Sequence, residues 1–460
     1  MSVQDNESQA GRQVAYRSLL RNRSFVALWL GQTISFIGDY FYWLAIPILV
    51  ERLTGSTLMV GLSVISTAAP MLFLGPVAGV FVDRWDRRKT MVAADLLRAL
   101  LVLLCLTVRS PEQVWVYYLV GFLMSSVSRF FFPAQNALLP LLVKGEAELL
   151  TANGLMQIVQ TVGLLVGPML AGFTIGLWGE SVAFWADSFT FLMSAAAILT
   201  MRVPRTTSGK QATGGQLAAV WAELREGVAY LFSSQVMVGV LLCLAVLQLG
   251  LGAINVLWVP FFQRTFGVGP EGLGAVDMAQ GMGMVIGGVT LGFFTGRLRR
   301  NTLVGWGIVI IGLLIALAGL APAYSLVNLV PALGAGLEGV APEALSVGQR
   351  LLYLPLLLLV YSLALGITLV PAQSALMTIM QLAVPDLKRG RVGSALNALV
   401  TVASLVSMAA ASTLGEVINL RWVYVIAGGF AIVSGLLGRA LIREPEPAEA
   451  GMLASVTAGE

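Results

Sequence analysis

The feature that most constrains this chain is a series of apolar runs, each about 18 residues or longer and almost free of charge. Runs of this length cross the hydrocarbon core of a bilayer as α-helices, because a helix satisfies its backbone hydrogen bonds internally. The runs are continuous and do not alternate polar with apolar residues, which excludes a membrane β-barrel. Only 11% of the residues are charged, against about 25% in a soluble domain. The sequence therefore predicts an all-α membrane protein with many spans.

The apolar runs are separated by short polar or turn-forming segments, which allows the spans to be counted. Twelve spans are expected, with ends defined to within a few residues. They are 25–50, 57–82, 90–108, 113–141, 150–178, 181–201, 235–260, 270–297, 302–321, 352–380, 391–416 and 420–442.

Lysine and arginine are distributed unequally between the two sides of the predicted bundle. Of 28 basic residues, 21 fall on the side of both termini, and Arg98 and Arg129 fall within spans. Basic loops stay in the cytoplasm, so both termini are expected there, with the chain in the cell (inner) membrane. The net charge of +4 reflects this topology, and nucleic acid is not an expected partner. The opposite side carries Arg52, Arg109, Arg264, Arg350 and Arg421.

Two short motifs recur in equivalent places of the two halves. "PAQNAL" (133–138) returns as "PAQSAL" (371–376), and "GVFVDRWDRR" (79–88) is echoed by "GFFTGRLRR" (292–300). Duplication of a six-span unit is typical of secondary transporters, which bind substrate between the halves. We therefore expect two pseudo-symmetric six-helix halves, 25–201 and 235–442, in a chain that encloses a path as a monomer.

The remaining segments are two tails, a linker and an insertion. The tails (1–24 and 443–460) and the linker (202–234) are expected to be cytoplasmic, and the insertion (322–351) extracytoplasmic. In the linker, "LAAVWAELREGVAYLF" places its apolar residues on one helical face. This pattern predicts either an amphipathic helix on the membrane surface or a plain connector. The insertion includes "YSLVNLVPAL", which is apolar enough for a short interfacial helix; a neutral loop expansion is the alternative.

Residue types that support enzyme or cofactor chemistry are scarce. The chain has no histidine, and both cysteines, Cys105 and Cys243, fall inside apolar runs. We expect no metal site, no cofactor and no nucleophile–base constellation, so an intramembrane enzyme is disfavoured. Without histidine, any proton coupling falls to carboxylates.

The segment "GVFVDRWDRRK" between the second and third spans resembles the loop 2–3 motif of the major facilitator superfamily. In that family the loop latches the two halves together on the cytoplasmic side. The arginines are expected to reach lipid phosphates or neighbouring carboxylates. Asp86 stands where the family often has a second glycine, which puts the tight turn in doubt. The residues that match the motif are Gly79, Asp83, Arg84, Arg87 and Arg88.

The fifth span resembles the antiporter motif of the superfamily's drug–proton antiporters, with Ala171 as the single departure. Glycines at this spacing let another helix approach closely, and the proline kinks the span. The matching residues are Gly154, Gly163, Gly167, Pro168 and Gly172. Further stretches, such as "FFFPAQNALLP" (130–140), resemble a narrower branch of macrolide-efflux pumps, the enterobactin exporter and lysophospholipid transporters. The resemblance implies the major facilitator fold and export.

Asp39, in the first span, is the leading candidate for a proton or substrate site. Ionisable groups deep in a span cost roughly 2.5–3.5 kcal/mol, so they mark function by default. Counted from Phe25, Asp39 lies about 21 Å from the inner face, in the outer half of the span. Tyr40 and Trp43 are nearby and can wall an apolar cavity. The alternative is a structural aspartate satisfied by a neighbouring helix.

Other charged residues fall within the spans at different depths. Arg129 is expected nearer the cytoplasm, too far below Asp39 for direct pairing, as a site for an anionic group or a conformational switch. Asp187 is expected at a depth similar to Asp39, about 9 Å below the outer face. Asp277 is expected near the outer end of its span, where water can reach it. Asp95 and Arg98 are three residues apart and predict a local helical pair.

Polar side chains in the fourth, fifth and tenth spans are candidates for lining the cavity. Gln135 and Gln373 occupy equivalent positions in the repeat, which favours a shared gating or packing role. The cavity candidates are Gln135, Asn136, Gln157 and Gln373.

These patterns predict an exporter of a hydrophobic or amphipathic, drug-like small molecule that works by alternating access. Its expected partners are membrane lipids, the substrate and protons, which are exchanged for the substrate. A lipid, lysophospholipid or siderophore transporter of the same fold is the alternative. A channel is less favoured, because two repeated halves already enclose a path.

Overall fold

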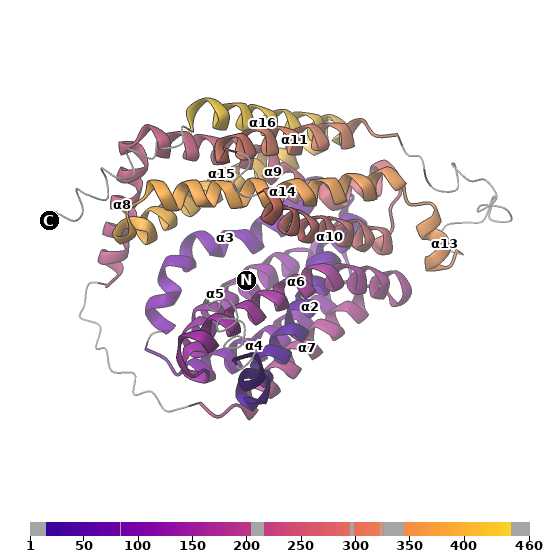
Figure 1. Cartoon of the computed structure of the whole chain (residues 1–460). Helices are drawn as coiled ribbons and strands as arrows, with labels where there is room; N and C mark the ends of the chain where they lie inside the picture. Colours follow the sequence, from indigo (N-terminus) through magenta and orange to yellow (C-terminus); the bar gives the residue numbers. More distant parts are fainter. Residues whose placement is uncertain are drawn as a thin grey trace. The chain divides into compact units, whose positions relative to one another are not determined.

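The structure is a computed structural model, and it describes residues 15–82, 84–203, 216–294, 299–322, 325 and 345–442. Helices make up nearly all of these residues (Figure 1). Their one β feature is an isolated bridge between Ser325 and Pro355. The predicted all-α fold is confirmed.

Eleven of the described helices are long and apolar enough to cross a membrane. Another long helix, α10 (Pro270–Phe294), carries Glu271, Asp277 and seven glycines and is not among them. Every predicted span overlaps either one of the eleven helices or α10. The eleven are α2 (Arg23–Thr54), α3 (Thr57–Val82), α4 (Arg87–Leu103), α5 (Trp115–Leu142), α6 (Gly145–Trp178), α7 (Glu180–Thr200), α9 (Gln235–Phe266), α11 (Arg300–Leu320), α14 (Leu356–Ala383), α15 (Arg389–Val417) and α16 (Leu420–Leu441).

Short elements join the long helices. The third span ends as a 3-10 helix, η1 (Leu104–Thr107), and η2 (Pro111–Gln113) leads into α5. The short helix α13 (Val347–Leu352) precedes α14, and η5 (Asp386–Lys388) joins α14 to α15.

The chain divides into two compact units, which are described separately. The first unit takes the described residues within Met1–Leu217, Val256–Gly281 and Ala323–Leu359. The second takes those within Ala218–Asn255, Met282–Pro322 and Val360–Glu460. One end of α9 and one end of α10 therefore belong to the same unit as α2 to α7. The division into halves at 25–201 and 235–442 stays a prediction.

Close helix packing depends on glycines in both units. In the first unit, α2 packs against α6 and α7, and α4 packs against α5 and α7. In the second unit, a Cβ added to Gly312 of α11 would lie 2.6 Å from Gly428 O of α16. Removing side chains from a helix face in this way lets two backbones meet inside a membrane.

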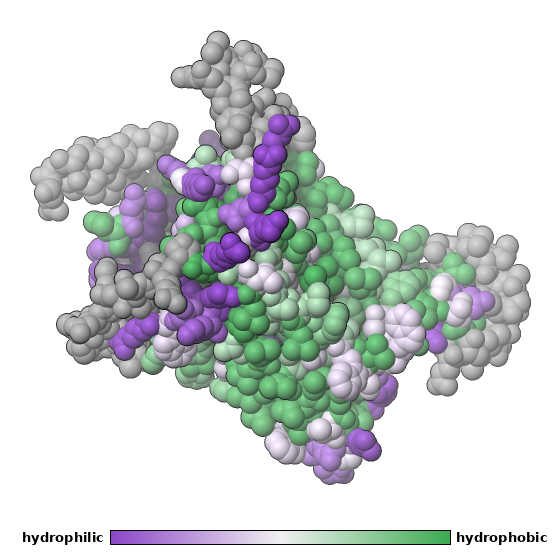
Figure 2. Space-filling view, turned by 90° about the horizontal axis from the view of Figure 1, so that it is seen from below, coloured by the Kyte–Doolittle hydropathy of each residue, from purple (hydrophilic) through white to green (hydrophobic). Residues whose placement is uncertain are grey.

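The outer faces of the helices are apolar. On α4, the large side chains of Leu96, Leu97 and Leu100 are exposed, the last of them 65%. Figure 2 shows broad hydrophobic areas with hydrophilic residues gathered beside them. Exposed leucine at this density is typical of a surface that faces lipid tails.

The predicted linker helix is present as α8 (Gln216–Ser233). Within the second unit, Arg391 of α15 donates to Glu226 of α8 (Nη1 to Oε2, 2.6 Å). The Tyr230 hydroxyl donates to Ala383 O at 3.4 Å. Contacts to α14 and α15 therefore hold α8. Of the insertion 322–351, most of "YSLVNLVPAL" lies outside the described residues.

Candidate functional site

Two glycines bring α2 and α7 into close contact. A Cβ added to Gly31 would lie 3.1 Å from Ala197 Cβ, and one added to Gly38 would lie 2.8 Å from Thr190 Cβ. Below about 3 Å something must shift, so only glycine fits at position 38 without rearrangement. The contact places Asp39, next to Gly38, beside the segment of α7 that carries Asp187.

Four charged residues from three helices form what we call the aspartate cluster. Asp39 of α2 interacts electrostatically with Asp95 and Arg98 of α4, and Asp187 of α7 interacts with Asp39 and Arg98. Arg98 Nη2 donates to Asp95 Oδ1, so the predicted local pair is confirmed. The sequence did not predict that this pair joins Asp39 and Asp187.

The Arg98 guanidinium is held between two aromatic rings. Its Cζ lies 4.6 Å from the ring centroid of Phe131 and 4.4 Å from that of Phe191. The Arg98 residue is only 4% exposed. Cation–π contacts with both rings stabilise the charge and restrict its position.

Asp187 is the most isolated carboxyl of the cluster. The residue is 0% exposed, and neither of its carboxylate oxygens has a hydrogen-bond partner among the described residues. The hydroxyl of Tyr42 on α2 interacts electrostatically with Asp187 and also lacks a hydrogen-bond partner among the described residues. Buried polar groups are nearly always paired, so this exception calls for a functional explanation.

The motif glycines of α6 contact the stretch of α2 that surrounds Asp39. A Cβ on Gly163 would lie 3.3 Å from Phe36 Cβ, and one on Gly167 would lie 2.8 Å from Tyr40 Cγ. Further along α6, a Cβ on Gly172 would lie 3.1 Å from Gly274 Cα of α10. Gly154 has no neighbour within 4 Å of such a Cβ, and Pro168 is buried inside α6.

Aromatic residues continue along α2 beyond Asp39. The Tyr40 and Trp43 ring centroids are 6.3 Å apart, and Trp43 lies 5.7 Å from Trp258 of α9. Tyr40 also interacts electrostatically with Asp277 of α10. Asp277, which we expect water to reach, is half-buried, and its Oδ2 is buried without a hydrogen-bond partner in the described part of the chain.

The other predicted site residues differ in burial, and Gln373 belongs to the second unit. Arg129 is half-buried and forms no ion pair with a described carboxylate, and its Nε has no described partner. Gln135 is 7% exposed, whereas its repeat equivalent Gln373 is exposed. Asn136 is exposed, and so is Gln157, whose Nε2 lies 3.5 Å from Gln160 Oε1.

A second charged group, which we call the Glu51 cluster, joins the ends of several helices in the first unit. Arg264, in the last turn of α9, donates to both carboxylate oxygens of Glu51 on α2 and to Gly55 O at 2.7 Å. The sequence placed Arg52, Arg264 and Arg350 on one side but did not predict their acidic partners. The remaining pairs are Arg52 Nη1 with Glu180 Oε1 at 2.7 Å, and Arg350 Nη1 with Glu271 Oε1 at 3.8 Å.

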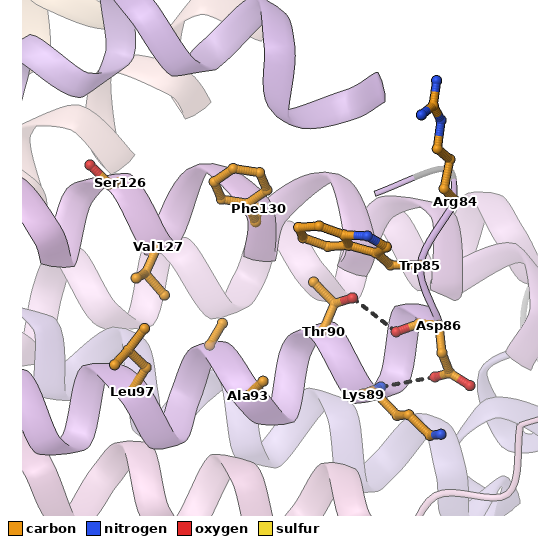
Figure 3. A pocket seen from close by; sticks show the side chains of 11 residues that line it. Arg84, Trp85, Asp86, Lys89, Thr90, Ala93, Leu97, Ser126, Val127 and Phe130 are labelled. Carbon is orange, nitrogen blue, oxygen red and sulfur yellow. Dashed lines mark hydrogen bonds between the residues drawn. The ribbon is translucent and has the colours of Figure 1, made fainter. Parts of the chain in front are cut away.

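The loop between α3 and α4 has its own interactions (Figure 3). Trp85 stacks on Phe130, with centroids 5.7 Å apart, beside a pocket of about 700 Å³ that Arg84 also lines. Asp86 caps α4 by accepting a hydrogen bond from Lys89 N at 2.9 Å. Asp86 has φ −65°, so the turn needs no glycine there.

The arginines of this loop bind backbone carbonyls of neighbouring helices. Arg87 Nη1 donates to Ala137 O of α5 at 3.2 Å, and Arg88 Nε donates to Ile198 O near the end of α7 at 3.1 Å. The sequence predicts lipid phosphates or carboxylates as partners of these arginines, whereas the partners described here are carbonyl oxygens. A cation at a helix C-terminus interacts favourably with the helix dipole. Gly79 lies in α3 with no neighbour near an added Cβ, and Asp83 lies outside the described residues.

Comparison with known proteins decides the family. A profile of the Major Facilitator Superfamily matches residues 28–352 and 344–454. The chain belongs to this superfamily. The family predicted from the loop between the second and third spans is thus confirmed, and this major facilitator chain is a multi-pass membrane transporter, not an enzyme.

Relatives of this major facilitator chain include exporters. Macrolide efflux protein A of Streptococcus pyogenes is 28% identical over 65% of this chain and 73% of the relative. The enterobactin exporter EntS of Salmonella typhi is 26% identical over 60% of this chain and 65% of the relative. The crystal structure of a bacterial homologue of the iron transporter ferroportin has the same fold, with a TM-score of 0.67 at 15% identity, covering 91% of this chain and 98% of that one.

Proposed function

We propose that this transporter exports a hydrophobic or amphipathic small molecule by alternating access, in exchange for protons. The observation that carries the proposal is the packing of the α6 motif glycines on the Asp39 segment of α2. Gly163 meets Phe36 and Gly167 meets Tyr40, on either side of Asp39 in the sequence. A motif that resembles that of drug–proton antiporters therefore borders the leading candidate for the proton carrier.

The Glu51 cluster supports alternating access. Its ion pairs tie α2 and α7 to α9, and Gly172 of α6 packs on Gly274 of α10. At one end of the first unit, these contacts hold together segments that come from different halves of the sequence. In our proposal this end faces outward, the termini are cytoplasmic, and the chain works as a monomer in the inner membrane.

In the transport cycle we assign the coupling step to Asp39. A proton from outside binds Asp39, and the substrate leaves from a site that we place beside Tyr40 and Trp43. Deprotonation toward the cytoplasm then readies the carrier for a new substrate from the cytoplasm or the inner leaflet. Asp83, Arg84, Arg87 and Arg88, with Gly79 before them, form the proposed latch at the cytoplasmic end.

The names of the relatives supply two candidate substrate classes. Macrolides come first, because macrolide efflux protein A aligns over most of its own length. A catecholate siderophore is the second candidate, because of the similarity to the enterobactin exporter. Both classes are large and amphipathic, which fits a site beside the neighbouring rings of Tyr40, Trp43 and Trp258.

The test is Asp39→Asn, with export of a macrolide such as erythromycin measured in cells that lack their own pumps. We expect this change to abolish export driven by a pH gradient while the protein reaches the membrane in normal amounts. Asp386→Asn is the matched control, since Asp386 lies in a connecting segment with its side chain 83% exposed. Undiminished export by Asp39→Asn would reject the assignment. Enterobactin, assayed in parallel, separates the two substrate classes.

A further inference from the structure

The aspartate cluster has an unbalanced charge. Three carboxyl groups, those of Asp39, Asp95 and Asp187, interact electrostatically with a single guanidinium, that of Arg98, and only Asp95 is bonded to it. If all three acids were ionised, the cluster would carry two uncompensated negative charges inside a membrane helix bundle. An unpaired charge in such an environment is strongly unfavourable.

Arg98 is unable to compensate all three acids. Its guanidinium donates to Asp95 and lies between the rings of Phe131 and Phe191, at 4.6 and 4.4 Å. Turning toward Asp187 would remove both ring contacts and the ion pair with Asp95. The Asp95–Arg98 pair is therefore a fixed unit. The negative charges of Asp39 and Asp187 are then neutralised only by a cation, such as a proton, that enters from outside.

The surroundings of Asp187 offer no further base. From α2 it faces Asp39 and Tyr42, and from α4 it faces Arg98 with its partner Asp95. Among the described residues, Cys105 of η1 interacts with Asp187 and with Tyr42, and Tyr117 of α5 interacts with Tyr42. Tyrosine and cysteine are neutral near pH 7, so they add no positive charge.

We propose that Asp187 and Asp39 form a proton-binding pair, with the buried Asp95–Arg98 unit as its fixed neighbour. Asp187 is wholly buried with both oxygens unpartnered, so its neutral acid form suits this site. Asp39 is half-buried and is the member through which a proton arrives. Binding forms one O–H bond on a carboxylate and removes one negative charge from the cluster. The proposal rests on the proposed exchange of protons for substrate, and it adds Asp187 as the residue that holds the proton.

The test is pH-difference infrared spectroscopy on the purified full-length transporter, which resolves the carbonyl band of a protonated carboxylic acid. Asp187→Asn is expected to remove a pH-dependent band of this kind. Asp39→Asn is expected to keep a band but to change its midpoint pH, because the two acids interact. Asp187→Glu keeps a carboxyl group and should keep the band, and Asp386→Asn should match the unaltered protein. A full, unchanged band in Asp187→Asn overturns the pair.

Transport by the same samples in proteoliposomes separates this proposal from the proposed function. If Asp187→Asn removes the band while the unaltered protein moves neither erythromycin nor enterobactin, the proton pair is supported and the exporter assignment fails. If the unaltered protein exports erythromycin against a pH gradient while Asp187→Asn keeps the band and the transport, the exporter is supported and the pair fails.

Discussion

The aspartate cluster and the Glu51 cluster are both built from acids and arginines in the first unit, but they differ in charge balance. In the Glu51 cluster, three acids meet three arginines. In the aspartate cluster, three acids meet one arginine. The charges of the Glu51 cluster balance among its own members, although Glu271 Oε2 is buried without a hydrogen-bond partner among the described residues. In our proposal, the charges of the aspartate cluster balance only when protons bind.

The arginines of the two clusters also differ in their exposure to solvent. Arg52 and Arg264 keep 61% and 35% of their side chains exposed, whereas Arg98 keeps 4%. The acids do not differ in this way, since Glu51 is buried as Asp187 is. Exposed ion pairs respond to salt because mobile ions screen them, and buried unbalanced acids respond to pH. The Glu51 cluster is thus suited to closing a helix end, and the aspartate cluster to sensing protons.

The largest expected effect comes from removing the only arginine of the aspartate cluster. Arg98→Met leaves Asp95 without its partner, which should cost about 3–5 kcal/mol of unfolding free energy near neutral pH. The loss should shrink as the pH falls, because protonation removes the uncompensated charges. Thermal unfolding of the purified protein across pH measures it.

The matched control for Arg98→Met is the double variant Arg98→Met with Asp95→Asn, which removes both partners and should recover much of the loss. Equal destabilisation at all pH values would show that the charge imbalance is not what Arg98 relieves.

The next largest effect concerns the helix contact that assembles the aspartate cluster. In Gly38→Ala the new methyl group meets Thr190, so α2 must move away from α7. Overpacking of this kind costs about 1–3 kcal/mol, and the infrared band of Asp187 should change with it. Gly154→Ala, in α6 with free space around it, is the control and should be neutral or slightly stabilising. If both variants behave alike, the close approach is not needed.

In the Glu51 cluster, charge reversal tests whether the balance matters. Glu51→Arg places like charges together beside Arg264 and should cost roughly 1–2 kcal/mol, since the pair is partly exposed. Adding Arg264→Glu restores an opposite-charge pair and should return most of that stability. No recovery in the double variant would mean that Glu51 acts through something other than its charge. Thermal unfolding measures both.

The smallest expected effect is a salt dependence. Arg264→Gln should lower stability by about 1 kcal/mol or less at low salt. The difference from the unaltered protein should shrink as salt is raised, whereas the corresponding difference for Arg98→Met should stay nearly constant. A salt effect of equal size on both variants would remove the distinction between the clusters.

The sequence predicted the helices and the family well, because both depend on local patterns. The predicted span 57–82 coincides with α3, since the length and polarity of an apolar run define a transmembrane helix. The loop motif gave the family for a similar reason, because its residues are contiguous. Boundaries beside polar turns were less accurate, as in α6, which begins at Gly145 and not at 150.

The candidate site was only partly accessible from the sequence. Depth counting gave Asp39 and Asp187 similar heights, and the structure brings them together. Depth counting gave no reason to include Arg98 in the site, because packing, not depth, decides which faces of α2, α4 and α7 meet. A glycine at 31 and another at 38, seven residues apart on α2, were the signal that could have revealed the α2–α7 contact.

The neighbouring indoles of Trp43 and Trp258, tilted by 39° to each other, provide an intrinsic optical reporter. Their centroids are 5.7 Å apart and they come from α2 and α9, whose ends Glu51 and Arg264 tie together. Separation of these helix ends alters the environment of both rings and hence their fluorescence. The chain has ten tryptophans, so the signal is isolated by subtracting the spectrum of a Trp258→Phe variant. Any opening of this end in the proposed transport cycle can thus be timed in an unlabelled protein.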